Sequence, residues 1–247
     1  MPGISKSGLD LINRSPAHYK WAKEKPQDPT PAMRIGTLTH LAVLEPERFD
    51  SECVVMPQMD RRTKDGKLRW EEFQAQYPDH ELLTNDEHTR IISIRDAVRA
   101  HPMARKLMDR IAEIEVSTFW TDPISGIECR CRPDAVLGDG KLIDLKTTRD
   151  AGPGFERSVR QYRYHVQASF YGDGMGGMEQ HPMVFIAVET EAPYLVSCNI
   201  IGPDSLVAGR EAYRRNLDTY AKCMESGIWP GYSDTIQTVN LPDWELE

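Results

Sequence analysis

Apolar residues in the first part of the chain recur every three to four positions, the spacing of helices that bury one face. This pattern predicts helices over residues 5–24, 33–45 and 85–109. Pro16 interrupts the first helix, Pro46 ends the second and Pro102 kinks or splits the third, because proline cannot donate the helical hydrogen bond. The polar, basic segment 57–69 is predicted to be an exposed loop.

The pattern changes in the middle of the chain, where apolar and polar residues alternate as they do in β-strands. Strands are predicted over residues 114–121, 127–137, 141–147, 183–190 and 194–201. The turn sequences DPISG and GDG join the first three strands as hairpins. Helices are predicted over residues 156–172 and from an Asp204 cap to about Ser226, where Gly227 ends the helix.

This order of elements predicts an α/β fold with a central mixed β-sheet flanked by helices and a helical N-terminal region. We expect a single domain over residues 1–247, because this length supports one sizeable core. Within it, residues 1–112 form a mainly helical part, 113–228 the α/β core and 229–247 an irregular C-terminal tail.

Composition and charge narrow the functional class. No apolar run approaches the roughly 20 residues that span a bilayer, and the five scattered cysteines are expected to be reduced thiols, so we expect a cytoplasmic protein without a membrane partner. The net charge of −8 argues against simple non-specific binding to duplex DNA. An acidic net charge remains compatible with a protein that encloses DNA, because such a protein needs only a locally basic lining, and with a site that collects carboxylates.

The segment RPDAVLGDGKLIDLKTT contains the candidate chemistry. Asp144 and Lys146 stand two residues apart on one strand and project from the same face, and the GDG turn brings Asp134 on the neighbouring strand beside them. Carboxylates are ligands for hard cations such as Mg²⁺, which lowers the pKa of bound water. Lys146 would orient or deprotonate that water or stabilise negative charge.

The same residues also have an ordinary structural interpretation, a salt bridge at a strand edge. The bare D-x-K pattern is common and favours that interpretation. The apolar residues around it favour a functional site, because charge inside a buried strand is unfavourable unless it is paired or bound to metal.

These residues resemble a known family. RPD-x₉-DLK resembles the PD-(D/E)XK nuclease motif, with Asp144 in place of the more common Glu. RIGTLTH, which ends at His40, resembles the G-x-x-x-H element of RecB-like nucleases, and QASFY, from Gln167 to Tyr171, resembles their Q-x-x-x-Y element. Several longer blocks resemble the RecE type of phage and prophage exonuclease, the C-terminal domain of exonuclease VIII, which is lambda-exonuclease-like: GTLTHLAVLEPE, RRTKDGK, DPISGIECRCRPD and YRYHVQASFYGDG.

The resemblance implies a metal site with Mg²⁺ as cofactor and Mn²⁺ as an alternative. His40, Asp134, Asp144 and the backbone carbonyl of Leu145 would be its ligands, and Lys146 would be the catalytic lysine.

Further residues follow from the same resemblance. Glu115 would bind a second metal, with an ordinary strand glutamate as the alternative. Gln167 and Tyr171, one helical turn apart, would line the site and position substrate.

Five basic residues are candidates for DNA binding. Two of them, Arg130 and Arg132, share the strand face of Asp134 by period two, and ion pairs with acidic residues are the alternative. The others lie in the basic segment, where a solvated loop is the alternative: Arg61, Arg62 and Lys64.

The resemblance implies a metal-dependent exodeoxyribonuclease that degrades linear double-stranded DNA from the 5′ end and leaves 3′ single-stranded overhangs for recombination. Expected partners are double-stranded DNA ends, a RecT-like single-strand annealing protein, and further copies of the chain in a ring-shaped trimer or tetramer. The alternatives are a RecB-like nuclease of other polarity, an endonuclease, and a non-catalytic DNA-end-binding recombination module.

Overall fold

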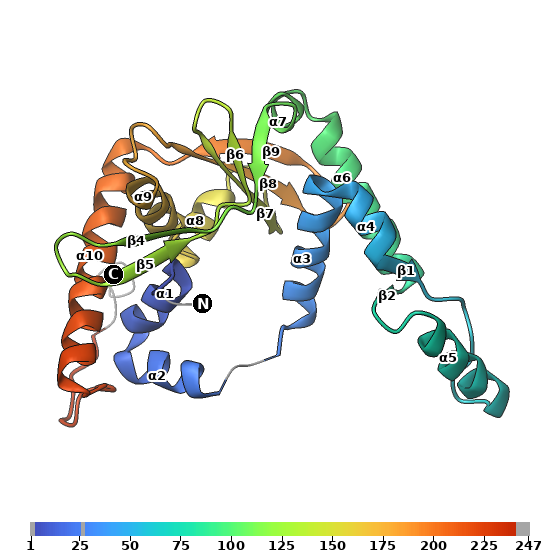
Figure 1. The fold of residues 1–247 in the computed structure, drawn as a ribbon, viewed down its shortest axis with the longest axis horizontal. Coiled ribbons are helices and arrows are strands. Elements are labelled where there is room, and N and C mark those ends of the chain that lie inside the picture. The colour runs from blue at the N-terminus through green and yellow to red at the C-terminus, as the bar shows by residue number, and fades with distance from the viewer. Residues whose placement is uncertain (1–2, 26–27, 241–247) are drawn as a thin grey trace.

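The computed structural model describes residues 3–25 and 28–240 (Figure 1). The first helices and strands of this part are α1 (Lys6–Arg14), α2 (Pro16–Glu24), α3 (Pro31–Leu44), α4 (Pro46–Glu52), β1 (Cys53–Val55), α5 (Lys64–Gln76), β2 (Glu81–Leu83), α6 (Asn85–Ala100) and α7 (Pro102–Met108). They are followed by β3 (Ile111–Ile114), β4 (Thr118–Thr121), β5 (Glu128–Cys131), β6 (Ala135–Leu137), β7 (Leu142–Thr148), α8 (Phe155–Gln161), α9 (Tyr164–Gly174), β8 (Met183–Glu189), β9 (Val196–Ile200) and α10 (Pro203–Ser226).

Local sequence signals explain where the early helices begin. Ser5 caps α1 by accepting the Gly8 amide, and Ser15 ends α1 and caps α2. Thr84 caps α6 in a reciprocal capping box with Glu87. The predicted breaks at the prolines are confirmed.

The central sheet has the strand order β3-β6-β7-β8-β9. Only β7 and β8 pair in parallel, and the other neighbours are antiparallel, so the sheet is mixed as predicted. The connection from β7 to β8 runs through α8 and α9, as a parallel pair requires. Strands β4 and β5 form the predicted hairpin, but as a separate two-stranded sheet.

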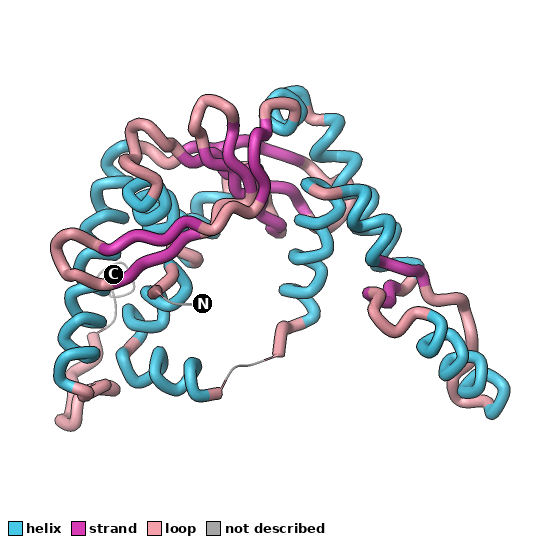
Figure 2. The backbone as a smooth tube through the Cα atoms, viewed as in Figure 1, coloured by secondary structure: helices cyan, strands magenta, loops and turns pink. Residues whose placement is uncertain are grey.

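Helices cover both faces of the sheet (Figure 2). On one face Ile143 and Leu145 of β7 pack with residues of α3, α6 and α7. On the other face Leu142 of β7 packs with α8 and α9. Because neighbouring residues of a strand point to opposite faces, Asp144 and Lys146 lie on the face that α9 covers.

The ribbon forms an arch, with α1 and α2 on one side, the sheet across the top and α3 on the other (Figure 1). Apolar residues of α1 and α2 pack against α9 and α10, which fixes that side of the arch. An arm made of β1, α5 and β2 extends from the side of α3 and α6, away from the sheet. None of the helices in the described ranges is both long and apolar enough to cross a membrane.

Several predicted boundaries were wrong. The basic segment 57–69 is only partly a loop, because Thr63 caps α5 and residues from Lys64 onward are helical. The predicted strand 127–137 breaks between Cys131 and Ala135, where Pro133 cannot donate to a sheet.

The later helices also differ. The predicted helix 156–172 is split into α8 and α9 by Arg163, which has a left-handed backbone with φ of 55°. The N-cap of α10 is Gly202 and not Asp204, which lies in its first turn. The short elements α4, β1 and β2 were not predicted. Described tail residues 229–240 are irregular as expected, and the rest of the predicted tail lies outside the described residues.

The contact between α9 and α10 is tight enough to test. A Cβ atom at Gly209 would lie 2.4 Å from the carbonyl oxygen of His165. We expect Gly209→Ala to lower the free energy of unfolding by about 1–3 kcal/mol, because overpacking outweighs the roughly 1 kcal/mol helix preference for alanine. Urea denaturation measures this change. Gly138→Ala, where a Cβ meets nothing within 4 Å, is the control, and equal stability of both variants would contradict the account.

Candidate active site

Strand β7 and helix α9 together bury the central charge pair. Asp144 is 3% exposed, and its Oδ2 atom lies 2.6 Å from Lys146 Nζ. From α9, Gln167 Nε2 donates a hydrogen bond to Asp144 Oδ1. Lys146 Nζ also lies 4.7 Å from the centre of the Tyr164 ring. The pair is thus compensated by an amide on one side and an aromatic face on the other.

Asp134 lies just before β6 and joins two other parts of the chain. Its Oδ2 atom accepts the Leu145 amide at 2.7 Å and lies 3.4 Å from His40 Nδ1. The first contact fixes Asp134 beside β7, and the second brings in α3. The structure therefore brings His40, Asp134, Asp144, Lys146 and Gln167 together, with Leu145 contributing its amide to the group.

Burial and charge act differently on the two carboxyl groups. Burial raises the pKa of Asp144, and the Lys146 ammonium offsets this only in part. Burial also acts to raise the pKa of Asp134, but His40, Lys146 and the Leu145 amide outweigh it and hold that pKa below its usual value. The pKa of Lys146 is raised despite burial, because Asp144 favours the ammonium form. Neighbouring residues thus already compensate part of the negative charge of both carboxylates.

This donor set fits a hard divalent cation. Asp144 Oδ2 is buried and accepts no hydrogen bond of standard geometry, although Lys146 is close, so it remains an acceptor that a cation could satisfy. Asp134 and His40 supply a second carboxylate and an imidazole. Across the described ranges, no three His, Cys, Asp or Glu side chains already stand close enough to form a ready metal cage. Binding would therefore require Asp144 to exchange its contact with Lys146.

Tyr171 connects α9 to the segment that carries Asp134. The backbone amide of Arg132 hydrogen-bonds to the Tyr171 phenol, and burial raises the pKa of this phenol. The ring packs beside Phe170. Tyr171 therefore lies beside the backbone just before Asp134, and its predicted role in positioning substrate stays a prediction.

Glu115 does not join this group of side chains. Its backbone amide donates to the Asp134 carbonyl, but its carboxylate forms an ion pair with Arg132. Glu115 has a left-handed backbone, with φ of 52°. Arg132 therefore forms an ion pair, which was the alternative to a contact with DNA. The prediction that Arg132 shares a strand face with Asp134 and Arg130 was wrong, because the strand ends at Cys131.

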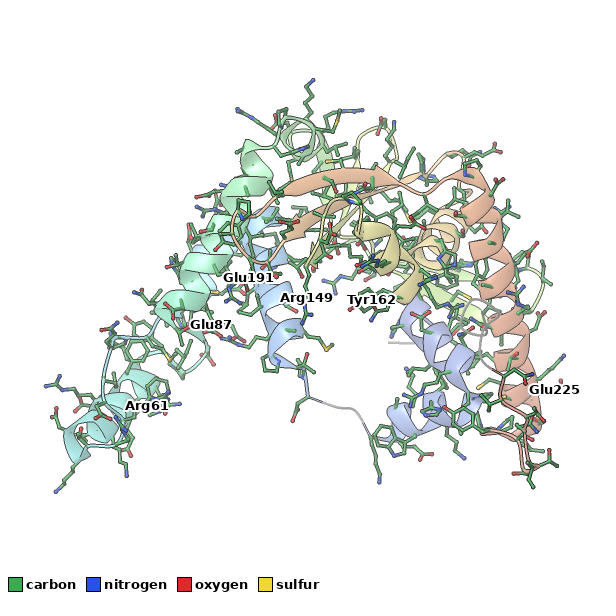
Figure 3. All side chains as sticks on the ribbon, turned by 180° about the vertical axis from the view of Figure 1, so that it is seen from behind. Arg61, Glu87, Arg149, Tyr162, Glu191 and Glu225 are labelled. Carbon is green, nitrogen blue, oxygen red and sulfur yellow. The ribbon has the colours of Figure 1, made fainter. Side chains whose placement is uncertain are left out.

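The three DNA-binding candidates of the basic segment lie far from the site. Figure 3 shows Arg61 on the arm, well away from the sheet. Its guanidinium lies 4.5 Å from the centre of the Trp70 ring, and Arg62 pairs with Asp60. Lys64 begins α5. The structure does not bring these side chains to the carboxylates.

Other residues beside the site were missed in the sequence. Lys6 of α1 and Tyr162 at the end of α8 meet there, and Arg163 pairs with Asp10. Arg149 is exposed directly after β7, on the concave side of the arch together with Tyr162 (Figure 3). The four-residue spacing of Lys6 and Asp10 predicts a pair on one helix face, but no local pattern indicates its contact with residues 162–163.

A metal titration tests the donor set without requiring activity. We expect Mn²⁺ to raise the melting temperature of the wild type, because a ligand that binds only the folded state stabilises it, by about 2.7 kcal/mol at one hundred times its Kd. Asp134→Asn should lose most of this shift. The control Asp139→Asn removes a carboxylate paired with Lys141 at the β6–β7 turn and should keep it. Equal shifts in both variants would contradict the assignment.

Comparisons with known proteins agree with this fold. A solved structure described as a "Putative exonuclease" from Eubacterium rectale superposes with a TM-score of 0.65 and 11% identity, covering 99% of this chain and 92% of that one. At this identity the likeness shows the fold alone. The match to the structure of SSO0001 covers 60% of this chain and 69% of that one at 12% identity, and its TM-score of 0.29 does not indicate a shared fold.

No curated protein matches the chain. A family model described as a PDDEXK-like domain of unknown function, DUF3799, matches residues 5–242. This match spans α1 to α10 and includes every residue of the site. The chain therefore belongs to the DUF3799 family of PDDEXK-like domains.

Proposed function

We propose that this protein is a metal-dependent nuclease that hydrolyses DNA phosphodiester bonds at the Asp134–Asp144–Lys146 group. The observation that carries the proposal is the convergence of two carboxylates, a lysine and a histidine from separate parts of a PDDEXK-like fold. A buried charge group of this kind is unfavourable for stability unless it is compensated, and such groups concentrate at functional sites.

The residues of the site have two roles, metal binding and stabilisation of the reacting groups. Asp134, Asp144 and His40 would hold Mg²⁺, with Mn²⁺ as the alternative, and the Leu145 carbonyl is a further candidate ligand. The cation supplies activation of water and charge neutralisation at the phosphate. Lys146, released from Asp144, orients the attacking water or stabilises charge on the phosphate.

Gln167 and Tyr171 act through position. Gln167 holds the Asp144 carboxylate by its other oxygen, and Tyr171 fixes the backbone before Asp134. Both side chains come from α9, so this one helix contacts Asp144 and the segment before Asp134.

The finer proposal is a RecE-type exonuclease that digests linear duplex DNA from 5′ to 3′ and leaves 3′ overhangs. Its support is the resemblance of motifs spread over the chain, and the solved neighbour with the same fold is described as a "Putative exonuclease". A cytoplasmic ring of three or four copies, with a RecT-like annealing protein as the next partner, completes this proposal. In such a ring only the DNA-facing surface must be basic, which is compatible with the net charge of −8.

Digestion of end-labelled linear duplex with Mg²⁺ tests the activity and its polarity. The wild type should release a 5′ label as short products first, and Lys146→Ala should lower the rate by about 10²–10⁴-fold, the usual contribution of a positioned proton-transfer group. Lys141→Ala, in the same hairpin but outside the site, is the matched control.

Inactivity of the wild type, or equal rates for Lys146→Ala and Lys141→Ala, would refute the nuclease proposal. Closed circular DNA separates the finer alternatives, because an endonuclease nicks it and an obligate exonuclease leaves it intact. Early release of a 3′ label would overturn the polarity alone.

A further inference from the structure

A second feature lies directly beside the candidate site. A cavity of about 370 Å³ opens between the start of α1 and the junction of α8 and α9, and Lys146 and Gln167 form its wall toward the carboxylates. This volume is within the range of roughly 300–1,000 Å³ that is usual for small-ligand pockets. Of the residues that line the cavity, the proposed function involves only Lys146 and Gln167, so the rest of the lining has no role in it.

Positive charge predominates around this cavity. Lys6 Nζ lies 2.7 Å from Asp10 and donates to the Tyr162 carbonyl at 2.5 Å, while Arg163 pairs with the same Asp10 at 2.8 Å. Burial lowers the pKa of Lys6, and the Asp10 carboxylate offsets this only in part. Three cations thus line the space, against Asp10 in the lining and Asp144 directly behind Lys146. The remaining excess of positive charge favours an anionic ligand.

An aromatic surface borders the same cavity. The Tyr162 side chain is 52% exposed. Its ring stacks on Tyr164 at 5.7 Å and 24°, and Tyr164 stacks on the buried Phe185 at 5.4 Å and 20°. The exposed ring is therefore the outer member of a column anchored in the core, on the concave side of the arch (Figure 3).

The cavity and the exposed ring together favour a ligand that is anionic and that stacks on an aromatic ring. A nucleotide has both properties. Cations contact the phosphate, and the ring stacks on a base, an interaction that every base can make. Stacking on a protein side chain requires the base to leave its own duplex stack, so the ring favours unpaired nucleotides.

We propose that this cavity is a subsite for one unpaired nucleotide of the strand that enters the site, with its base on Tyr162 and its phosphate near Lys6 and Arg163. The inference rests on the proposed nuclease function and specifies it: the strand reaches the carboxylates unpaired. Tyr162 binds substrate and takes no part in proton transfer.

Fluorescence of 2-aminopurine measures the stacking without cleavage. The probe is a duplex whose single-stranded end carries 2-aminopurine, mixed with protein in EDTA. Wild type and Tyr162→Phe should quench the fluorescence on binding, because both retain a ring, whereas Tyr162→Ala should not. Tyr232→Ala removes another exposed tyrosine, outside the cavity, and should behave as wild type. Circular dichroism verifies that each variant is folded.

Steady-state digestion provides the second measurement. Tyr162→Ala should raise KM about tenfold with little change in kcat, because loss of one stacked base removes ground-state binding. Lys6→Gln should also raise KM, while Lys20→Gln, an exposed lysine outside the cavity, should leave KM unchanged.

The two proposals can fail separately. Quenching by Tyr162→Ala equal to that of the wild type overturns the subsite, even if the wild type digests DNA. Quenching that depends on Tyr162 in a protein without cleavage activity supports the subsite and refutes the nuclease.

Discussion

The buried ion pair between Asp144 and Lys146 is the constraint on which the rest of the structure depends. Removing two charges from water is unfavourable by several kcal/mol for each ion, so they require close compensation. Gln167 and the Tyr164 ring provide it, and both belong to α9. Helix α9 must therefore lie against this face of β7, and the close packing of α10 at Gly209 holds it there.

Asp134 extends this constraint to the other side of the sheet. Its carboxylate is fixed by the Leu145 amide and meets His40, which α3 contributes. The site therefore joins three parts of the chain that are distant in sequence: the early helix, the β6–β7 hairpin and the helix after β7. A fold that left out any of the three would leave a buried charge without its partner, which explains why chemistry and packing are coupled here.

The sequence was informative where local patterns decide the structure. Alternation in LIDLKTT placed Asp144 and Lys146 on one face, and the GDG turn placed Asp134 beside them. The sequence was uninformative where contacts between distant segments determine the structure. The left-handed backbone at Glu115 and its pair with Arg132 depend on tertiary context, and so does the meeting of Lys6 with Tyr162, 156 residues away.

The basic segment shows the same limit. Its charge suggested a DNA-binding loop, but nothing in residues 57–69 indicates how far the arm extends from the carboxylates. The number of basic residues in a segment describes its composition, but it does not indicate how far the segment lies from the carboxylates in the folded protein. By contrast, the shared position of Arg149 and Tyr162 on the concave side becomes evident only once the arch is seen, because residues 149 and 162 are separated in the sequence.

The central claim is that Asp134 and Asp144 share a divalent cation while Lys146 turns toward substrate. Anomalous diffraction from a crystal grown with Mn²⁺ and a short duplex with an unpaired end measures this directly. We expect a Mn²⁺ peak bound by both carboxylates, with Lys146 Nζ moved from Asp144 toward a phosphate. A peak bound elsewhere, or an intact contact between Lys146 and Asp144 with DNA in place, would contradict it.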